Sequence, residues 1–295
     1  MRVVVTGANG FLGSRLVGRL AEHGHGVVAV GRNAAAAGCE IVDRRFDACD
    51  WSRLGACDVL FHFAAINDTS VRDEDVIRRV NVEAPLECME RAVAAGCRGI
   101  VYASSMHVYG RVPAPMTVAA SSPAPVSPYG RSKLALEQGV TDLCRRRGVG
   151  CVGLRFANVY GPGESHKGRM ASQVLQIARQ MRAGDPEIYA PGTQVRDFVH
   201  VDDAVEAAVK AGDLAAAGGS AILNCGSGAG TSFNDLVAML NAALGLNRTP
   251  RYVPEPAGYL AAVVLDVTET IARLAWHPRP LRTGLADYLA SGECR

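Results

Sequence analysis

The sequence predicts an α/β fold, built around a doubly wound parallel sheet and followed by a smaller C-terminal lobe. Short β-rich runs alternate with helical stretches through the first half of the chain, as in repeated β-α-β units. The strand runs are apolar without interruption, which is typical of a parallel sheet buried on both faces. After Gly161 the alternation loosens. We therefore expect one domain at 1–162 and a second lobe at 163–295 that is partly interleaved with it.

The elements of the first domain are expected in regular order. Phe11–His23 carries Leu12, Leu16 and Leu20 at helical spacing, shortly after the apolar run Val3–Val5. The other expected strands are Val27–Val30, Val59–Phe63, Gly99–Ala103 and Val149–Arg155, and the other expected helices are Val76–Ala95, Pro128–Arg147 and pieces near Met170–Ala183, Asp202–Ala216 and Ser232–Leu244. The Pro- and Ala-rich segment Val112–Pro128 predicts a surface loop.

Composition argues against several classes of protein. The 295 residues are 48% hydrophobic and 20% charged, with a net charge of +2, so the chain offers no basic surface for nucleic acid. No apolar run approaches the roughly 20 residues that cross a bilayer, and the N-terminus does not resemble a signal peptide. The nine cysteines are irregularly spaced and form no Cys-x-x-Cys motif. We expect a cytoplasmic protein with reduced thiols and no metal site.

A glycine triplet lies between the first strand and the first helix, in the run Thr6–Gly13. Gly7 permits a tight turn, Gly10 lets the backbone approach a pyrophosphate, and Gly13 allows close packing of helix on sheet. The free N–H groups of the helix N-terminus then face the phosphates. This pattern predicts a Rossmann-like dinucleotide site. The remaining expected contacts from the same turn are Asn9, Phe11 and Leu12.

The end of the second strand indicates which dinucleotide binds. NAD sites usually carry an acidic residue here for the ribose 2′-hydroxyl, but this sequence has Arg32. A guanidinium pairs well with a 2′-phosphate, so NADP is favoured and NAD is the alternative. Asp47 either meets the adenine amino group or caps a loop turn.

A second motif supplies acid–base groups. Tyr129 and Lys133 form a Tyr-x-x-x-Lys pair at the start of a helix, and this spacing puts both side chains on one face. A nearby ammonium favours the phenolate, which then accepts a hydroxyl proton while hydride leaves the same carbon. Ser104 and Ser105 follow a strand, at the sheet edge where ligands bind in open parallel sheets.

The ordered set of motifs resembles the extended short-chain dehydrogenase/reductase family, in its nucleotide-sugar epimerase/dehydratase group. The matching pieces are Thr6–Gly13, Phe61–Ala65, Asn81, Ser104–Gly110, Tyr129–Lys133, Asn158–Pro162 and Arg196–Asp203. The resemblance implies a nucleotide-diphosphate sugar substrate, a homo-oligomer, and Ser105, Tyr129 and Lys133 as the catalytic group. It further implies cofactor contacts at Ala64 and Asn81 and substrate contacts at Ser104 and Asn158. Arg196 would meet the diphosphate, unless it pairs with Asp197 or Asp202.

The residues after Ser105 discriminate between branches of this family. Dehydratases carry an Asp-Glu pair where this chain has Met106 and His107, so water elimination is disfavoured. His107 has a side chain whose pKa suits acid–base work at neutral pH, and it would contact substrate. The alternative is a histidine that is hydrogen-bonded in the pocket wall.

The run His166–Ser172 resembles the corresponding stretch of ADP-L-glycero-D-manno-heptose 6-epimerases. That resemblance implies Lys167 as a second acid/base, with His166 and Arg169 near the sugar; the alternatives are a surface lysine or a phosphate contact. Arg169 replaces the serine usual in the run. The expected function is 6-epimerisation of an ADP-glycero-manno-heptose through a 6-keto intermediate. A UDP-hexose 4-epimerase, an NADPH-dependent 4-ketosugar reductase and a non-catalytic NADP-sensing regulator are the alternatives.

Overall fold

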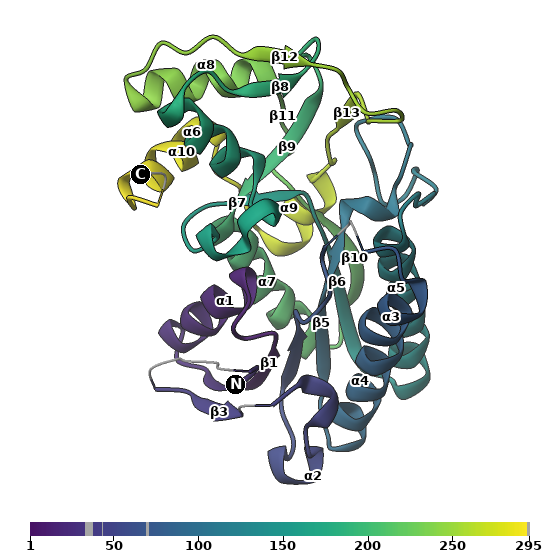
Figure 1. The fold of residues 1–295 in the computed structure, drawn as a ribbon. Coiled ribbons are helices and arrows are strands. Elements are labelled where there is room, and N and C mark those ends of the chain that lie inside the picture. The colour runs from purple at the N-terminus through teal and green to yellow at the C-terminus, as the bar shows by residue number, and fades with distance from the viewer. Residues whose placement is uncertain (33–37, 43, 69–70, 294–295) are drawn as a thin grey trace.

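The computed structural model describes residues 1–32, 38–42, 44–68 and 71–293; Cys294 lies outside this part. One large parallel sheet, flanked by helices, carries a smaller lobe at one end (Figure 1). The predicted α/β class with a doubly wound sheet is confirmed. None of the described helices is long and apolar enough to cross a membrane.

The large sheet has seven strands in the order β10-β6-β5-β4-β1-β2-β3, all parallel to their neighbours. Their bounds are β1 Arg2–Thr6, β2 Gly26–Val30, β3 Glu40–Val42, β4 Val59–His62, β5 Gly99–Ser105, β6 Gly150–Phe156 and β10 Ser220–Cys225. The order reverses between β1 and β4, so the carboxyl ends of these two strands flank the crevice in which such sheets bind ligands.

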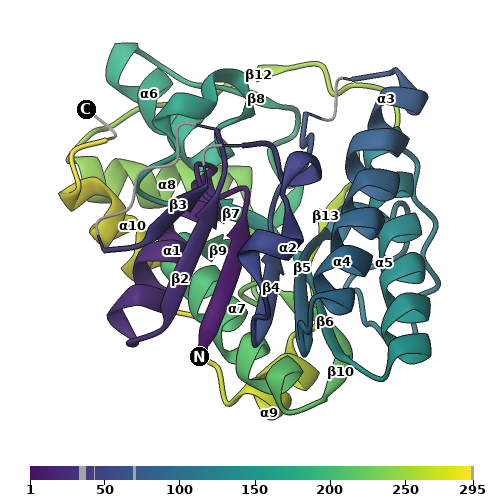
Figure 2. The same cartoon turned by 90° about the horizontal axis from the view of Figure 1, so that it is seen from below.

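Helices cover both faces of the sheet, as the two views in Figures 1 and 2 show. One face carries α1 Phe11–Glu22 and α7 Val201–Ala216, with α9 Thr268–Leu274 beside them; the other carries α2 Trp51–Leu54, α3 Glu74–Arg78, α4 Ala84–Ala94 and α5 Pro128–Arg147. The two hydrophobic cores lie between these layers and the sheet. Small residues let α7 approach closely: a Cβ on Gly212 would lie 2.5 Å from the Phe61 ring.

Two details differ from the sequence expectation. The helix expected over Val76–Ala95 is instead α3 and α4 joined by a π-helical turn at Arg79–Glu83. The turn contains Asn81, whose amide bonds both backbone groups of Ile66, and π-turns often mark such special contacts. The short strand β3 was not expected, because two of its three residues are exposed and form no apolar run.

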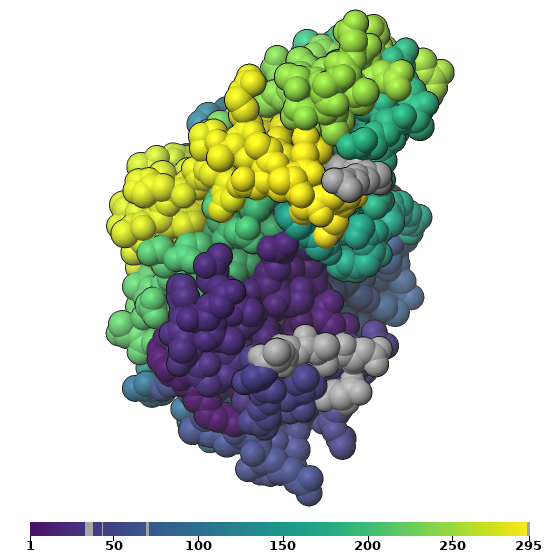
Figure 3. All heavy atoms as spheres, turned by 90° about the vertical axis from the view of Figure 1, so that its left-hand side faces the viewer, coloured from purple at the N-terminus to yellow at the C-terminus, as the bar shows by residue number. Residues whose placement is uncertain are grey.

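The second lobe is built from short elements. Strands β7 Asn158–Tyr160, β9 Val195–His200, β11 Gly230–Ser232 and β13 Ala262–Val263 form one sheet, β8 Glu187–Tyr189 pairs with β12 Arg251–Val253, and the helices are α6 Gln173–Ala183, α8 Phe233–Leu244 and α10 Leu281–Ala290. Between these elements the chain returns to the large sheet and adds α7 and β10. In the space-filling view of Figure 3 the C-terminal segment lies between the two lobes.

Candidate active site at the carboxyl edge of the sheet

A cavity of about 720 Å³ opens at the carboxyl edge of the large sheet, where it meets the second lobe. Its wall contains thirteen of the residues expected from the sequence: Gly10, Phe11, Leu12, Gly13, Ser104, Ser105, His107, Tyr129, Lys133, Asn158, His166, Lys167 and Arg169. These residues come from five segments of the chain, so the fold brings the glycine turn, the end of β5, the Tyr-x-x-x-Lys helix, strand β7 and the His166–Ser172 run to one space.

The glycine turn has almost no room for side chains. Gly7 has φ +72°, and a Cβ there would lie 2.7 Å from the backbone nitrogen of Ala64. A Cβ on Gly13 would lie 2.1 Å from the carbonyl oxygen of Gly7. Helix α1 therefore starts directly against the turn, and its first N–H groups face the cavity edge. Residues of this shape fit a dinucleotide pyrophosphate.

The residues expected at the adenosine end lie away from the cavity wall. Asn9 and Arg32 are exposed beside the turn, and a Cβ on Gly31 would lie 2.8 Å from the Asn9 amide oxygen. The Asp47 carboxylate accepts two hydrogen bonds from Arg45, at 3.0 and 2.8 Å, and this bond holds the pKa of Asp47 below its ordinary value. Asp47 is thus an ion-paired residue after β3.

Asn81 is buried behind the cavity instead of lining it. Its amide oxygen accepts from the Ile66 N–H at 2.8 Å, and its amide nitrogen donates to the Ile66 carbonyl at 2.9 Å and the Ser132 hydroxyl at 3.2 Å. These bonds hold the segment after β4, which includes Ala64. Asn81 therefore orders a wall of the crevice through the backbone.

Helix α5 positions the tyrosine and the lysine. Ser127 caps its N-terminus by accepting from the Gly130 N–H, and Pro128 occupies the first turn, where its missing N–H costs nothing. Tyr129 follows at once, and Lys133 lies one turn later with its Nζ 5.7 Å from the centre of the Tyr129 ring. The Lys133 ammonium donates to the Ala103 carbonyl at 2.8 Å, which ties it to the end of β5.

Burial moves the proton affinities of both groups. It raises the pKa of Tyr129 to about 12, and a hydrogen bond with Ser105 acts in the opposite direction. Burial lowers the pKa of Lys133 to about 8, while the Glu137 carboxylate favours the ammonium. The tyrosine is therefore protonated in the protein alone, and additional positive charge nearby would be needed to favour its phenolate.

A buried ion pair lies behind these residues. Glu137 is one helical turn after Lys133, and its carboxylate accepts a two-pronged bond from Arg155 on β6, at 2.9 and 2.7 Å. Both side chains are almost fully buried. The Ser104 hydroxyl donates to the same carboxylate at 2.5 Å. Ser104 lines the cavity. Because its hydroxyl already donates to Glu137, it is not free to turn toward a ligand.

His107 lies on the cavity wall, and Arg196 is close enough to affect its pKa. The His107 ring lies edge-on to the Tyr129 ring, with centroids 5.7 Å apart. Burial and the positive Arg196 lower the pKa of His107, so its neutral form is favoured. The Arg196 guanidinium lies over the rings of Tyr259 and Phe233, 4.5 and 5.7 Å from their centroids.

Arg196 makes neither ion pair that the sequence left open. Asp197 accepts from the Ser227 N–H and hydroxyl, and Asp202 pairs with Arg15 at 2.7 Å. Arg196 instead donates to the Val195 carbonyl at 2.8 Å. A guanidinium held by aromatic rings keeps most of its donors available for an anionic ligand.

The loop after β7 brings Lys167 to the cavity. Its Nζ lies 4.7 Å from the centre of the Phe11 ring and 3.8 Å from the Glu164 carboxylate. Burial lowers the pKa of Lys167, and Glu164 acts in the opposite direction. His166 and Arg169 lie on the same loop and are exposed, and Arg169 pairs with Asp68 at 2.8 Å.

Several residues of the wall were not expected from the sequence. These residues are Asn67, Gln173 and Gln176. They join Asn158, which was expected and whose amide donates to the Asp197 carbonyl at 2.9 Å. The two glutamines lie three residues apart, directly after the His166–Ser172 run, and this helical spacing was the available signal.

The chain is similar to known enzymes over nearly its whole length. A UDP-glucose 4-epimerase of Mycolicibacterium smegmatis is 35% identical over 98% of this chain and 96% of its own. An ADP-L-glycero-D-manno-heptose-6-epimerase of Cupriavidus pinatubonensis is 36% identical over 81% of this chain and 77% of its own. The solved structure of MoeE5 in complex with UDP-glucose and NAD is 34% identical, covers 98% of both chains and has a TM-score of 0.84.

The fold and the cavity are those of a dinucleotide-dependent enzyme with a Rossmann-like sheet. The profile of the NAD dependent epimerase/dehydratase family matches residues 3–226. The chain belongs to this family, as its motifs predicted, and it is an enzyme of the epimerase type.

The close contact at Gly13 gives a test of the cofactor site. We expect Gly13→Ala to weaken NAD binding at least about tenfold, because its methyl group would push the Gly7 carbonyl out of the turn. Gly18→Ala is the matched control, since it lies on α1 with no atom within 4 Å of its Cβ. Isothermal titration calorimetry measures the affinity of both variants for NAD. Equal affinity in both would contradict this placement of the cofactor.

Proposed function

We propose that this protein epimerises a nucleotide-diphosphate sugar, and that the reaction is the 6-epimerisation of an ADP-glycero-manno-heptose. The observation that carries the choice of carbon is Lys167. Its ammonium lines the same cavity as Tyr129, is mostly buried and has a lowered pKa. The cavity thus holds two groups that exchange protons, on two separate segments of the chain.

The chemistry explains why two such groups are useful. The hydrogen on carbon-6 of a heptose is not acidic, because no carbonyl group is adjacent, so a base cannot remove it directly. A dinucleotide held at the glycine turn would supply the hydride chemistry, which is oxidation of this carbon and its reduction again. Tyr129 accepts the hydroxyl proton during oxidation. Once the 6-keto sugar has turned over, its oxygen faces elsewhere, and Lys167 donates the proton.

The basic residues of the chain support a proton-transfer role for Lys167. Among 31 lysines and arginines only Lys133, Lys167 and Lys210 are lysines, and two of these three line the cavity. Arginine stays protonated in proteins, whereas a buried lysine readily changes its charge. Two of the three lysines of an arginine-rich chain thus lie on the cavity wall, and Lys167 is the one that the proposal uses to donate a proton.

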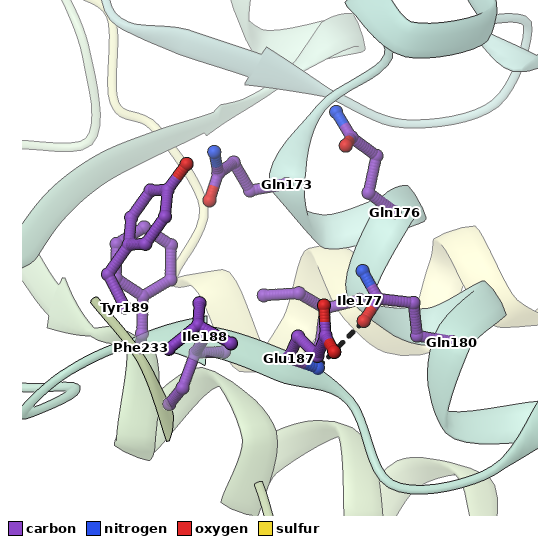
Figure 4. A pocket seen from close by; sticks show the side chains of 9 residues that line it. Gln173, Gln176, Ile177, Gln180, Glu187, Ile188, Tyr189 and Phe233 are labelled. Carbon is purple, nitrogen blue, oxygen red and sulfur yellow. Dashed lines mark hydrogen bonds between the residues drawn. The ribbon is translucent and has the colours of Figure 1, made fainter. Parts of the chain in front are cut away.

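The nucleotide of the substrate would extend toward the second lobe. A cavity of about 200 Å³ shares Gln173 and Gln176 with the larger one and continues past them to Tyr189 and Phe233 (Figure 4). The Arg196 guanidinium lies over the ring of Phe233. Arg196 would then bind the diphosphate between the sugar and the base. The flat rings and amide groups of the smaller cavity suit a nucleobase.

A 4-epimerase of a UDP-hexose is the second candidate. It is favoured by the extent of the similarity, since the UDP-glucose 4-epimerase relative matches over 98% of this chain and the heptose 6-epimerase relative over 81%. The two candidates share the use of Tyr129 and Lys133. They differ in the need for Lys167.

The proposed cofactor is NADP, with NAD as the alternative. Arg32 is exposed at the end of β2, beside the glycine turn, where it would meet a 2′-phosphate. MoeE5, a solved relative, was determined with NAD, which supports the alternative. The difference between the two dinucleotides is one phosphate, so binding affinities distinguish them directly.

The reaction is tested by proton NMR without added reductant. The purified protein is incubated with ADP-D-glycero-D-manno-heptose and, separately, with UDP-glucose. We expect the L-glycero isomer to appear from the heptose and UDP-glucose to remain unchanged. Conversion of UDP-glucose to UDP-galactose with no change in the heptose would replace the proposal with the second candidate.

Two substitutions of Lys167 test its role in proton transfer. We expect Lys167→Met and Lys167→Arg each to lower kcat for the heptose at least about 100-fold while NAD(P) still binds. The arginine variant keeps the positive charge but cannot release a proton. Full activity in Lys167→Arg would mean that Lys167 supplies charge only, as in a phosphate contact. Lys210→Arg is the control and should be as active as the unchanged protein.

Arg32→Gln tests the choice of dinucleotide. We expect the Kd for NADP to rise at least about tenfold, because an ion pair to the 2′-phosphate is lost, and the Kd for NAD to stay the same. Calorimetric titrations with both dinucleotides measure this difference. Unchanged NADP binding would remove Arg32 from the site. Arg53→Gln, whose side chain is exposed on α2, controls for a general loss of positive charge.

A further inference from the structure

A buried carboxylate lies directly beneath the loop that carries Lys167. Glu164 is fully buried, and it is surrounded by donors from three parts of the chain. The Ser172 N–H and hydroxyl donate to it at 2.5 and 2.7 Å, the Gly161 N–H at 3.3 Å, and the Tyr288 hydroxyl of α10 at 3.0 Å. These four hydrogen bonds fix the position of the Glu164 carboxylate.

These bonds close the loop at both ends. Gly161 precedes the loop and Ser172 follows it, where the Ser172 hydroxyl also caps α6 by accepting from the Leu175 N–H. One side chain therefore joins the end of β7 to the start of α6. The intervening 3-10 turn, Ser165–Met170, presents Lys167 to the cavity. The bond from Tyr288 adds support from α10, the last helix of the chain.

We propose that Glu164 is a positioning residue that holds Lys167 in place and maintains its charge for the reaction. The inference rests on the proposed function of Lys167. The geometry that carries it is the 3.8 Å separation between the Lys167 Nζ and the Glu164 carboxylate, with the Phe11 ring 4.7 Å from the same Nζ. The ammonium is thus set between a fixed anion and an aromatic face, next to the glycine turn.

Other charged and titratable groups around Lys167 are already engaged or lie further along the wall. Arg15 donates to the Pro162 carbonyl and pairs with Asp202, and Arg169 pairs with Asp68. His166 lies on the same loop, the Glu293 carboxylate accepts from the Gly163 N–H, and His107, Tyr129 and Lys133 line the same cavity. Glu164 is the charged group with a direct effect on the pKa of Lys167, which it raises against the effect of burial.

The experiment measures the proton affinity of Lys167 without using a substrate. The three lysines are labelled with trace acetic anhydride over a range of pH, and mass spectrometry gives the extent of labelling at each. Only the neutral amine reacts. We expect Glu164→Gln to make Lys167 reactive at a pH lower by about 1 unit or more, because the variant loses the anion that favours the ammonium. Lys133 and Lys210 in the same sample should not shift.

Tyr288→Phe is the matched control, because it removes one hydrogen bond to Glu164 and keeps the charge. We expect its Lys167 labelling to match that of the unchanged protein. If Glu164→Gln does not fold, Glu164→Asp replaces it: its shorter side chain withdraws the carboxylate, and a smaller shift in the same direction is expected. The proposal would be overturned if labelling of Lys167 began at the same pH in a folded Glu164 variant as in the unchanged protein. An equal shift of this pH at all three lysines would overturn it as well.

Activity then separates this inference from the proposed function. If Lys167→Met remains active but Glu164→Gln shifts the labelling, Glu164 positions a lysine that the reaction does not need, and the two-base mechanism fails alone. If the reaction needs Lys167 and Glu164 positions it, Glu164→Gln should also move one limb of the pH dependence of kcat to lower pH. Tyr288→Phe should leave that limb in place. A role limited to folding would lower kcat equally at every pH.

Discussion

The ion pair between Glu137 and Arg155 connects the helix of the site, α5, to strand β6 of the large sheet. Arg155 lies on β6, the strand next to the edge strand β10, and Glu137 lies on α5 on the same face as Tyr129 and Lys133. Both charges are nearly free of solvent contact. Removing either partner would leave the other unpaired in the interior, which commonly costs about 3–5 kcal/mol. The position of α5 relative to the strand ends therefore depends on this contact.

That position determines the chemistry available at the cavity. Lys133 reaches the end of β5 through the Ala103 carbonyl, and Tyr129 reaches Ser105 two residues further on. Neither side chain adjusts independently, because each is tied to the helix below and the strand above. Burial gives the tyrosine a high pKa and the lysine a low one, so the proton lies on the phenol until positive charge enters the site.

The motifs that the sequence predicted correctly are those whose geometry is local. The glycine turn needs only the strand before it and the helix after it, and Tyr129 and Lys133 need only one helical turn. Residues whose surroundings depend on distant segments were harder to interpret. The sequence left Asp47 either near adenine or capping a loop turn, and the structure shows its ion pair with Arg45. Asn81 binds the backbone of Ile66 behind the cavity. Glu164 resembles an ordinary loop residue until Tyr288, 124 positions away, is seen to contact it.

The return of the chain to the large sheet has a consequence for synthesis. Strand β10 pairs with β6 through Ser220–Cys225, and α7 buries one face of β5 and β6. Until residue 225 has left the ribosome, β6 is a bare edge and an apolar face of the sheet has no cover. The dinucleotide half of the molecule therefore matures late, after much of the second lobe has been made. Its nascent form is the species that a chaperone would have to protect from aggregation.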